Sequence, residues 1–389
     1  MSFVDLFISS VCMFFYFPFF PKNIWIISER GDQAQDNGIS FFKYLNSIDD
    51  DISSYYLLEK GNENIKRVGK IGKVILKGSL KHKMFFLMSN VIASTEKNII
   101  EPWGSNIFYK YFSSLYPQKI KVFLQHGVTD KDVSHVYGRK ISNFDLVVTV
   151  SKREKKFMVE QFGYNELNVI CTGFSRYDYL NLKSKNNIIT YIPTWRRYLV
   201  ELSDKSISNT IENKDNFLKS KYYLEIMDII NDSALISFLE EENLEFLFIT
   251  HYAFDIFSEL FSSKSDKIKI FKSGEIEIKS LLEISKIFIT DYSSIHFDSA
   301  YIGCNNIYYQ FDAEEFFDEH AGKSYFSYEI DGFGDLVNNK FDLIKVLEEI
   351  ASNNYVRKKM YCERVNKFFE FKDKNNSKRI YDEIKSFLK

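Results

Sequence analysis

Short apolar runs alternate with stretches of helical spacing along most of the chain. In the first half, the runs expected to be strands are residues 23–28, 55–59, 73–77, 86–94, 121–125, 146–151 and 168–173. In the second half they are residues 188–193, 245–250, 268–271, 287–291 and 306–312. Strands that alternate with helices are typical of a parallel sheet with helices on both faces. The pattern predicts an α/β fold of two sheet-containing halves that face a central cleft.

With a segment before and after the two halves, the chain is expected to have four segments. They are an apolar N-terminal segment (1–22), a first α/β domain (23–183), a second α/β domain (184–355) and C-terminal helices (356–389). The polar stretch 201–221 is interpreted as a long surface loop. Open α/β sheets bind ligands at the carboxyl ends of their strands, so motifs that follow strands are the first candidates for function.

The N-terminal run 3–20 is apolar apart from Asp5 and a few serines, and Pro18 interrupts its end. A membrane-spanning helix needs about 20 apolar residues. The run is slightly short, carries a charge and lacks the basic start of a signal peptide. We expect a short helix on a membrane surface. The alternative is a buried first helix of the globular domain.

The composition is that of a globular protein and weakens one class of function. The 389-residue chain is 45% hydrophobic and 27% charged, and 51 basic against 53 acidic residues leave a formal net charge of -2. Because nucleic-acid binders usually carry a basic excess, no nucleic-acid partner is expected. The four cysteines are scattered without metal-like spacing, which favours a reducing compartment and no metal site. Only ten basic residues are Arg, so an Arg after a strand is notable.

Two histidines directly follow predicted strands, one in each half. His126 follows 121–125 and precedes Gly127, which permits a tight turn. His251 follows the strand 245–250 in the second half. An imidazole transfers protons near neutral pH, so the pair predicts an acid–base site across the cleft. The alternative for either histidine is a structural hydrogen bond.

Three further motifs at strand ends have the chemistry of an anion site. They contain Ser175, Arg176 and Asp178; Thr194 and Arg196; and Asp291, Ser293 and Ser294. Guanidinium groups, hydroxyls and the N–H groups of a helix start all suit phosphate. The alternatives are an N-cap with a surface Arg, an exposed basic turn, and simple N-capping by a serine. No Walker loop, GxGxxG, HExxH or DxD motif is present in the sequence.

Several ordered stretches resemble the bacterial CDP-glycerol glycerophosphotransferase family, the teichoic-acid and capsule polymer synthases. They are ISERGDQAQDNG (27–38), FLQHGVTDKD (123–132), GFSRYD (173–178), PTWR (193–196), ITDYSSIHFD (289–298), YFSYEIDGFGDL (325–336) and FFEFKDKNNSKRIYDEI (368–384). Many members have HGTP followed by Lys. Here the sequence is His126-Gly127-Val128-Thr129-Asp130-Lys131, so the Pro is missing and an Asp is inserted before Lys131.

The resemblance implies a glycosyltransferase-B-like fold, with a Rossmann-like acceptor domain and a Rossmann-like CDP-donor domain. It implies transfer of glycerol phosphate, or a related alditol phosphate, from CDP-glycerol to a hydroxyl of a teichoic-acid-like or capsular polymer or a lipid-linked acceptor, with release of CMP. His126 matches the family's base and His251 its second functional histidine. Substrate-binding positions match Gly127, Ser175, Arg176, Asp178, Thr194, Arg196, Asp291, Ser293 and Ser294.

The resemblance gives no certain cofactor and leaves open whether Mg²⁺ accompanies the donor diphosphate. Together with the apolar N-terminal segment, it suggests a cytoplasmic protein on the inner face of the cell membrane. Two other functions stay open at this point: a nucleotide-sugar glycosyltransferase or epimerase of the same fold, and a non-catalytic polymer-binding scaffold.

Overall fold

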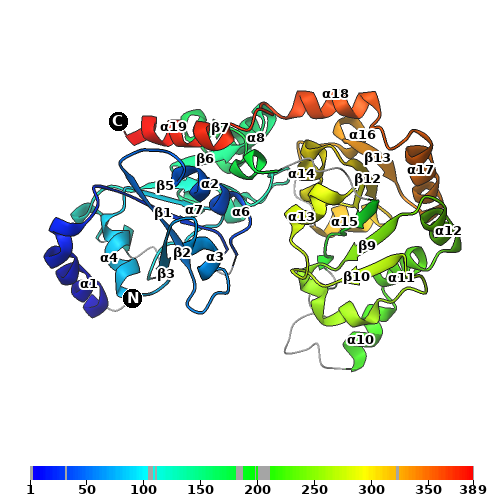
Figure 1. Cartoon of the computed structure of the whole chain (residues 1–389), viewed down its shortest axis with the longest axis horizontal. Helices are drawn as coiled ribbons and strands as arrows, with labels where there is room; N and C mark the ends of the chain where they lie inside the picture. The colour runs from blue at the N-terminus through cyan, green and yellow to red at the C-terminus, as the bar shows by residue number, and fades with distance from the viewer. Residues whose placement is uncertain are drawn as a thin grey trace. The chain divides into compact units, whose positions relative to one another are not determined.

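The computed structural model describes residues 3–30, 33–103, 108–109, 112–180, 187–197, 199, 211–320 and 324–388. The chain forms two compact units (Figure 1). The first contains residues 1–128, 133–179 and 369–389, and the second contains residues 129–132 and 180–368. Each unit is built on its own parallel sheet.

In the described part of the first unit, seven parallel strands lie in the order β3-β2-β1-β4-β5-β6-β7. They are β1 (Asn23–Ser28), β2 (Ile52–Leu58), β3 (Lys73–Leu76), β4 (Val91–Ser94), β5 (Ile120–Phe123), β6 (Leu146–Thr149) and β7 (Val169–Cys171). The helices are α1 (Phe3–Tyr16), α2 (Asn37–Leu45), α3 (Ile65–Gly69), α4 (Leu80–Met88), α6 (Ser134–Tyr137), α7 (Arg139–Ser142), α8 (Lys152–Phe162) and α19 (Asn376–Leu388), with 3₁₀ turns η1 (Phe17–Phe19), η2 (Ser113–Leu115), η3 (Glu166–Asn168) and η4 (Ser175–Asp178).

In the described part of the second unit, six parallel strands lie in the order β10-β9-β8-β11-β12-β13. They are β8 (Ile188–Tyr191), β9 (Glu245–Ile249), β10 (Ile268–Phe271), β11 (Ile287–Thr290), β12 (Asn305–Tyr309) and β13 (Gly334–Val337). The helices are α10 (Ile211–Leu218), α11 (Lys221–Ile230), α12 (Ser233–Glu241), α13 (Ile278–Ile284), α14 (Ile295–Ile302), α15 (Ala313–His320), α16 (Tyr328–Asp331), α17 (Lys340–Ser352) and α18 (Lys359–Phe368), with 3₁₀ turn η5 (Tyr252–Leu260).

The two-sheet α/β fold predicted from the sequence is confirmed, and the central strands are buried because helices cover the sheets. Strand β1 shows the pattern, since Ile24 to Ile27 are all at most 1% exposed. In the second unit, strand residues such as Phe246 and Ile289 share one core with Ile226 of α11 and Leu347 of α17. The cleft between the halves stays a prediction.

Local differences from the predicted elements have physical reasons. The run 86–94 was expected to be one strand, but α4 extends to Met88 and only Val91–Ser94 form β4. A short apolar run fits a buried helix turn as well as a strand, and Phe86 and Leu87 are buried from the helix. The predicted loop 201–221 lies outside the described residues up to 210, and α10 begins at Ile211.

The C-terminal helices do not form one separate segment. Helix α18 belongs to the second unit, whereas residues 369–389, including α19, return to the first. There Tyr381 packs against Trp25 of β1, with ring centroids 6.0 Å apart. The first unit therefore contains both ends of the chain (Figure 1).

Candidate active site

His126 lies just beyond β5 on an unusual stretch of backbone. The preceding residue, Gln125, has a φ of 57°, in the left-handed region that few non-glycine residues adopt. Its amide Nε2 donates to the Val148 carbonyl at 2.5 Å and to Glu154 Oε1 at 3.0 Å. The expected tight turn is thus made at Gln125, and Gly127 has no positive φ. The His126 side chain remains 54% exposed above this buried support.

Three sequence motifs that are distant along the chain meet beneath His126. Asn37 Nδ2 donates to the Gln125 carbonyl at 2.7 Å, and the Asn37 carbonyl accepts from Ser175 Oγ at 2.6 Å. Arg176 Nη1 donates to the His126 carbonyl at 2.9 Å and is paired with Asp36. These bonds join the start of α2, the end of β5 and η4. They fix the backbone of His126 while leaving its imidazole accessible.

Asp178, at the end of η4, is bonded to the first residues of α19. Its Oδ1 accepts from Asn376 N at 2.9 Å, and its Oδ2 accepts from Ser377 N at 2.7 Å. Gly173 permits this approach, since its φ is +79° and an added Cβ would lie 2.0 Å from Asn376 Oδ1. In the structure, the carboxylate of Asp178 therefore caps a helix.

Arg196 of the second unit is only 1% exposed. Its guanidinium forms ion pairs with Asp291 at 2.9 Å and with Asp312 at 2.5 Å, and it donates to the Thr194 carbonyl at 2.6 Å. Four aromatic rings surround it at 5.2 to 5.4 Å from their centroids: Tyr222, Tyr292, Phe311 and Phe316. The neighbouring Arg197 is exposed.

This network differs from the phosphate contacts expected of Arg196 and Asp291. The N–H groups of Arg196 already contact the carboxylates of Asp291 and Asp312 and the Thr194 carbonyl. The two carboxylates balance its positive charge. Asp291 is fully buried, and its Oδ1 accepts from the backbone N–H of Thr194 at 2.8 Å. Both side chains thus hold the turns after β8 and β11, and neither presents its charge at the surface.

Ser293 and Ser294 lie in the turn between β11 and α14, and both are partly exposed. Ser294 is the N-cap residue of α14, but its side chain makes no capping hydrogen bond. Ser293 Oγ accepts from Ile295 N at 3.4 Å, which is a weak bond. Lys131 adds a positive charge here, since its ammonium donates to the Tyr292 carbonyl at 2.8 Å. Hydroxyls, a helix start and an ammonium therefore converge at this turn.

His251 begins η5 just beyond β9. Its Nδ1 accepts from Ala253 N at 3.2 Å, which assigns this nitrogen to the local turn. The ring lies 4.2 Å from that of Tyr252 and 6.5 Å from that of Trp195, centroid to centroid. His296 differs, because it is 0% exposed and burial holds its pKa well below the usual range.

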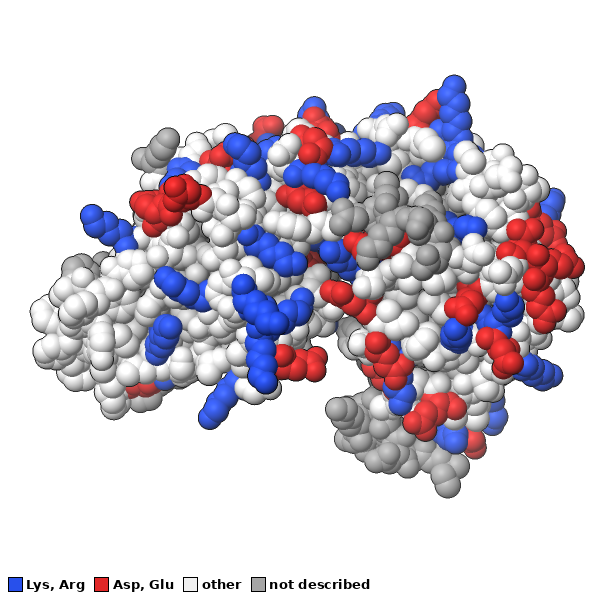
Figure 2. Space-filling model, in the orientation of Figure 1, with Lys and Arg blue, Asp and Glu red and all other residues white. Residues whose placement is uncertain are grey.

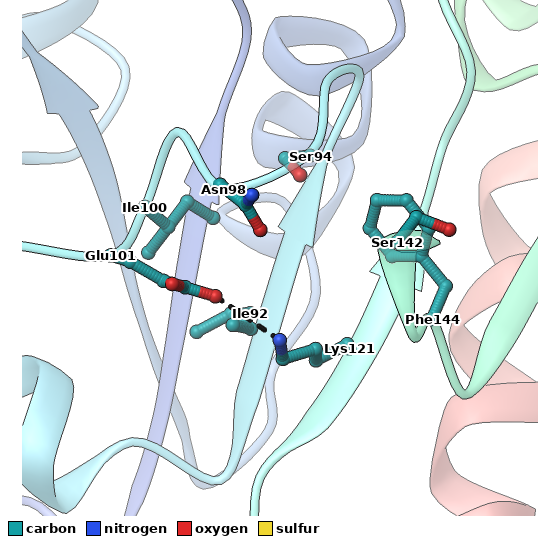
Figure 3. A pocket seen from close by; sticks show the side chains of 8 residues that line it. All are labelled: Ile92, Ser94, Asn98, Ile100, Glu101, Lys121, Ser142 and Phe144. Atoms are coloured by element: carbon teal, nitrogen blue, oxygen red, sulfur yellow. Dashed lines mark hydrogen bonds and ion pairs between the residues drawn. The ribbon is translucent and has the colours of Figure 1, made fainter. Parts of the chain in front are cut away.

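The first unit also contains a pocket beside β4 and β5 (Figure 3). It contains an ion pair between Lys121 of β5 and Glu101, with Nζ and Oε1 3.1 Å apart and both side chains at most 8% exposed. Ser94 at the end of β4 also lines it. Across the described ranges, no cluster of three or more His, Cys, Asp or Glu residues is arranged to hold a metal ion.

Sequence analysis did not single out Asn37 or Asp312. Asn37 begins a helix, and Asp312 comes three residues after β12. Asp312 closely follows a strand, so the rule that identified His126 would have found it, whereas Asn37 lies at the start of α2 and away from the end of β1.

The chain is similar to proteins of teichoic-acid synthesis. It is 32% identical over 367 residues to the minor teichoic acid biosynthesis protein GgaB of Bacillus subtilis, which covers 93% of this chain and 40% of GgaB. It is 24% identical to a teichoic acid glycerol-phosphate transferase of Staphylococcus aureus, over 93% of this chain and 92% of that protein. The chain thus spans less than half the length of GgaB.

The fold is that of a solved teichoic-acid enzyme. The wall teichoic acid polymerase TagF matches with a TM-score of 0.69 and 17% identity, covering 100% of this chain and 99% of that one. The model of the CDP-glycerol:poly(glycerophosphate) glycerophosphotransferases matches residues 9–386. With the strand-end histidines and the serine turn in place, the chain belongs to the CDP-glycerol:poly(glycerophosphate) glycerophosphotransferase family.

Proposed function

We propose that this chain transfers glycerol phosphate, or a related alditol phosphate, from a CDP-linked donor to a hydroxyl of a teichoic-acid-like or capsular polymer or of a lipid-linked acceptor. The observation that carries the proposal is an exposed imidazole, His126, on a backbone that two other motifs of the sequence hold in place. A proton acceptor of this kind is what attack by an alcohol requires.

The donor diphosphate is assigned to the turn that begins α14. Ser293 and Ser294 offer hydroxyls, the helix start offers a positive dipole end, and the Lys131 ammonium, which also pairs with Asp130 at 3.0 Å, lies at the same turn. Arg196 contributes indirectly, because its ion pair holds Asp291, which in turn orients the backbone of Thr194. We assign His251 to the same donor group, as the family resemblance implies.

The reaction then follows from these groups. His126 takes the proton of the acceptor hydroxyl, and the oxygen forms a bond to the β-phosphorus of the donor. The bond from that phosphorus to the bridging oxygen breaks, and CMP leaves with the electron pair. Charge that develops on the CMP phosphate is stabilised at the α14 turn. Positioning and electrostatics of this kind account for most catalysis of phosphoryl transfer.

The decisive experiment measures nucleotide release from CDP-glycerol, CDP-ribitol and UDP-sugars in the presence of an acceptor. We expect CMP release from a CDP-alditol and no UDP release. His126→Ala should lower the rate by about 10²–10⁴-fold, as loss of a general base does. His135→Ala is the matched control, since His135 is an exposed histidine of the same unit.

Two outcomes would contradict the proposal. UDP release would favour a sugar-nucleotide enzyme, and unchanged CMP release by His126→Ala would show that His126 is not the general base. His251→Ala should also impair turnover while leaving the unfolding transition in place, whereas a scaffold would keep its function in both variants. Repeating the assay with EDTA tests whether Mg²⁺ accompanies the donor.

We also propose that α1 rests on the inner surface of the cell membrane. One face of α1 is docked, since Leu6 is 5% exposed and Asp5 pairs with Lys83 at 2.7 Å. The other face is apolar and exposed, with Phe7, Phe14 and Phe15 between 69% and 74% accessible. In Figure 2 the surface formed by α1, at the left, is largely free of charge.

Several observations favour an interfacial helix. An amphipathic helix with exposed aromatic residues lies in the interface of a bilayer. No helix among the described residues has the length and apolar character needed to cross a membrane. All four cysteines are free thiols, which suits the cytoplasmic side.

Flotation with anionic liposomes tests this placement. The variant Phe7→Ser, Phe14→Ser, Phe15→Ser should float less than the wild type, while Phe341→Ser should not, because Phe341 is equally exposed at 74% but lies in the second unit. Removal of residues 1–22 should act like the triple change. If the wild type, both serine variants and the truncated protein float equally, α1 does not bind the membrane.

A further inference from the structure

Glu96 lies in the loop that follows β4, and its carboxylate forms an ion pair with His126. Its Oε1 is 3.7 Å from His126 Nδ1, and its Oε2 accepts a hydrogen bond from the Tyr137 hydroxyl at 2.7 Å. The Glu96 side chain is 20% exposed, and Tyr137 is 9% exposed. The Tyr137 hydroxyl thus holds Oε2 of Glu96, and Oε1 lies beside the imidazole of His126.

The loop that carries Glu96 is fixed at several points. Ser94 Oγ donates to the Glu96 carbonyl at 2.6 Å, and Lys97 Nζ donates to the Val136 carbonyl at 3.2 Å. Further along, Glu101 is tied to the sheet by the buried ion pair with Lys121 (Figure 3). The position of the carboxylate is therefore set by the fold, which is what preorganisation requires.

Tyr137 is itself locked in place. Its ring stacks on Phe123 of β5 with centroids 4.9 Å apart and an interplanar angle of 23°. Burial, together with the hydrogen bond and charge of Glu96, raises the pKa of Tyr137 above its usual range. The hydroxyl therefore keeps its proton and acts as the donor to Glu96.

We infer that Glu96 is a positioning residue for His126. At 3.7 Å the contact is longer than a hydrogen bond, and the negative charge of the carboxylate favours the tautomer with the proton on Nδ1, so Nε2 is left as the nitrogen that accepts the proton of the substrate hydroxyl. It also stabilises the imidazolium that forms in that step. The inference rests on the proposed function, in which His126 is the base. The same division of roles operates in other His–carboxylate pairs, where the wrong tautomer is costly.

This role differs from that of an ordinary surface ion pair. Because His126 is 54% exposed, its ion pair with Glu96 adds little to folding stability. Loss of Glu96 also removes the acceptor of the Tyr137 hydroxyl, so the unfolding transition of each variant is measured beside its activity. Its effect should appear in the tautomer of His126 and in kcat. For a partner that orients a functional histidine from outside, a loss of about 10–100-fold is typical.

The test needs no substrate in its first arm. Nitrogen-15 NMR of the full chain, labelled at histidine, reports which ring nitrogen of His126 carries the proton at mildly alkaline pH. In the wild type we expect the Nδ1–H form, and in Glu96→Ala a shift toward the Nε2–H form. Glu160→Ala is the control, because Glu160 is 54% exposed and is paired with Lys156 on α8. Tyr137→Phe should give a smaller shift than Glu96→Ala.

The second arm measures CMP release by the same variants. Glu96→Ala should lower kcat by about 10–100-fold with little change in KM, and Glu96→Gln should recover part of the loss because it keeps the shape. An unchanged tautomer in Glu96→Ala, or a kcat within the error of the Glu160→Ala control, would overturn the inference. Full activity of His126→Ala would instead overturn the proposed function, and the NMR arm would still decide whether Glu96 orients the ring.

Discussion

Both units carry polar side chains just beyond their strands, but the two units place them in opposite environments. In the first unit His126 is 54% exposed, and the backbone of Gln125 and His126 is held by Asn37 and by Arg176. In the second unit Arg196 is 1% exposed and its charge is balanced by Asp291 and Asp312. A strand-end position therefore predicts where a residue lies, and its partners decide whether it meets solvent.

Histidines show the same contrast within the first unit. His82, on α4, is 0% exposed, with Nδ1 accepting from Gly78 N at 3.0 Å and Nε2 2.8 Å from the Ile100 carbonyl. Both of its nitrogens are used by the fold. His126 has one nitrogen near a carboxylate and a side chain open to solvent. Similar residue types thus divide into structural and functional ones by access.

Replacing Arg196 with Ala should give the largest loss of stability. The change leaves Asp291 and Asp312 buried without their cation, and breaking a buried pair in this way costs about 3–5 kcal/mol. Arg197→Ala, the exposed neighbour, should cost no more than about 0.5 kcal/mol. Urea unfolding followed by circular dichroism measures both. Equal midpoints for the two variants would mean that the buried network does not stabilise the second unit.

Acidification should act through His82. Burial lowers the pKa of His82 from an ordinary 6.5 to about 4. Because the unfolded chain binds the proton more tightly, stability from this site is lost as the pH falls from 6.5 toward 4. At about 1.4 kcal/mol per pKa unit, the loss approaches about 3 kcal/mol.

The measurement compares urea unfolding of wild type and His82→Asn across this pH range. The variant keeps an acceptor for Gly78 N but does not titrate, so the wild type should lose stability relative to it as the pH falls. His135→Asn, an exposed control, should run parallel to the wild type. A constant difference between wild type and His82→Asn would show that the folded and unfolded states bind the His82 proton equally well, and that its pKa is not lowered by folding.

Much of the fold followed from local patterns. Alternating strands and helices predicted both sheets because each strand is buried by its own neighbours in sequence. Strand β13 (Gly334–Val337) was not predicted, since Gly334 and Asp335 give it a weak apolar signal. The return of α19 to the first unit was also not predicted, because contacts between distant segments leave no periodic trace.

For the site, the strand-end rule located His126, His251, Ser293 and Ser294. It did not reveal the burial of Arg196, whose partner Asp312 lies 116 residues away. The Asp178 bond to Asn376 spans 198 residues in the same way. Pairings of this separation depend on the completed fold, so the sequence indicated the residues but not which charges are already paired.

Asp178 gives the smallest effect and the finest test of the comparison. As a cap of α19 it should contribute about 0.5–2 kcal/mol, because Asp178→Ala leaves the backbone N–H groups of Asn376 and Ser377 without an acceptor. If capping is its whole role, CMP release at low temperature should stay near the wild-type rate. Asp373→Ala is a control, since Asp373 pairs with Arg379 of the same helix from a more exposed position. An unchanged unfolding midpoint together with a raised KM would instead place Asp178 among the groups that contact substrate, and the first unit would then expose a carboxylate as well as an imidazole.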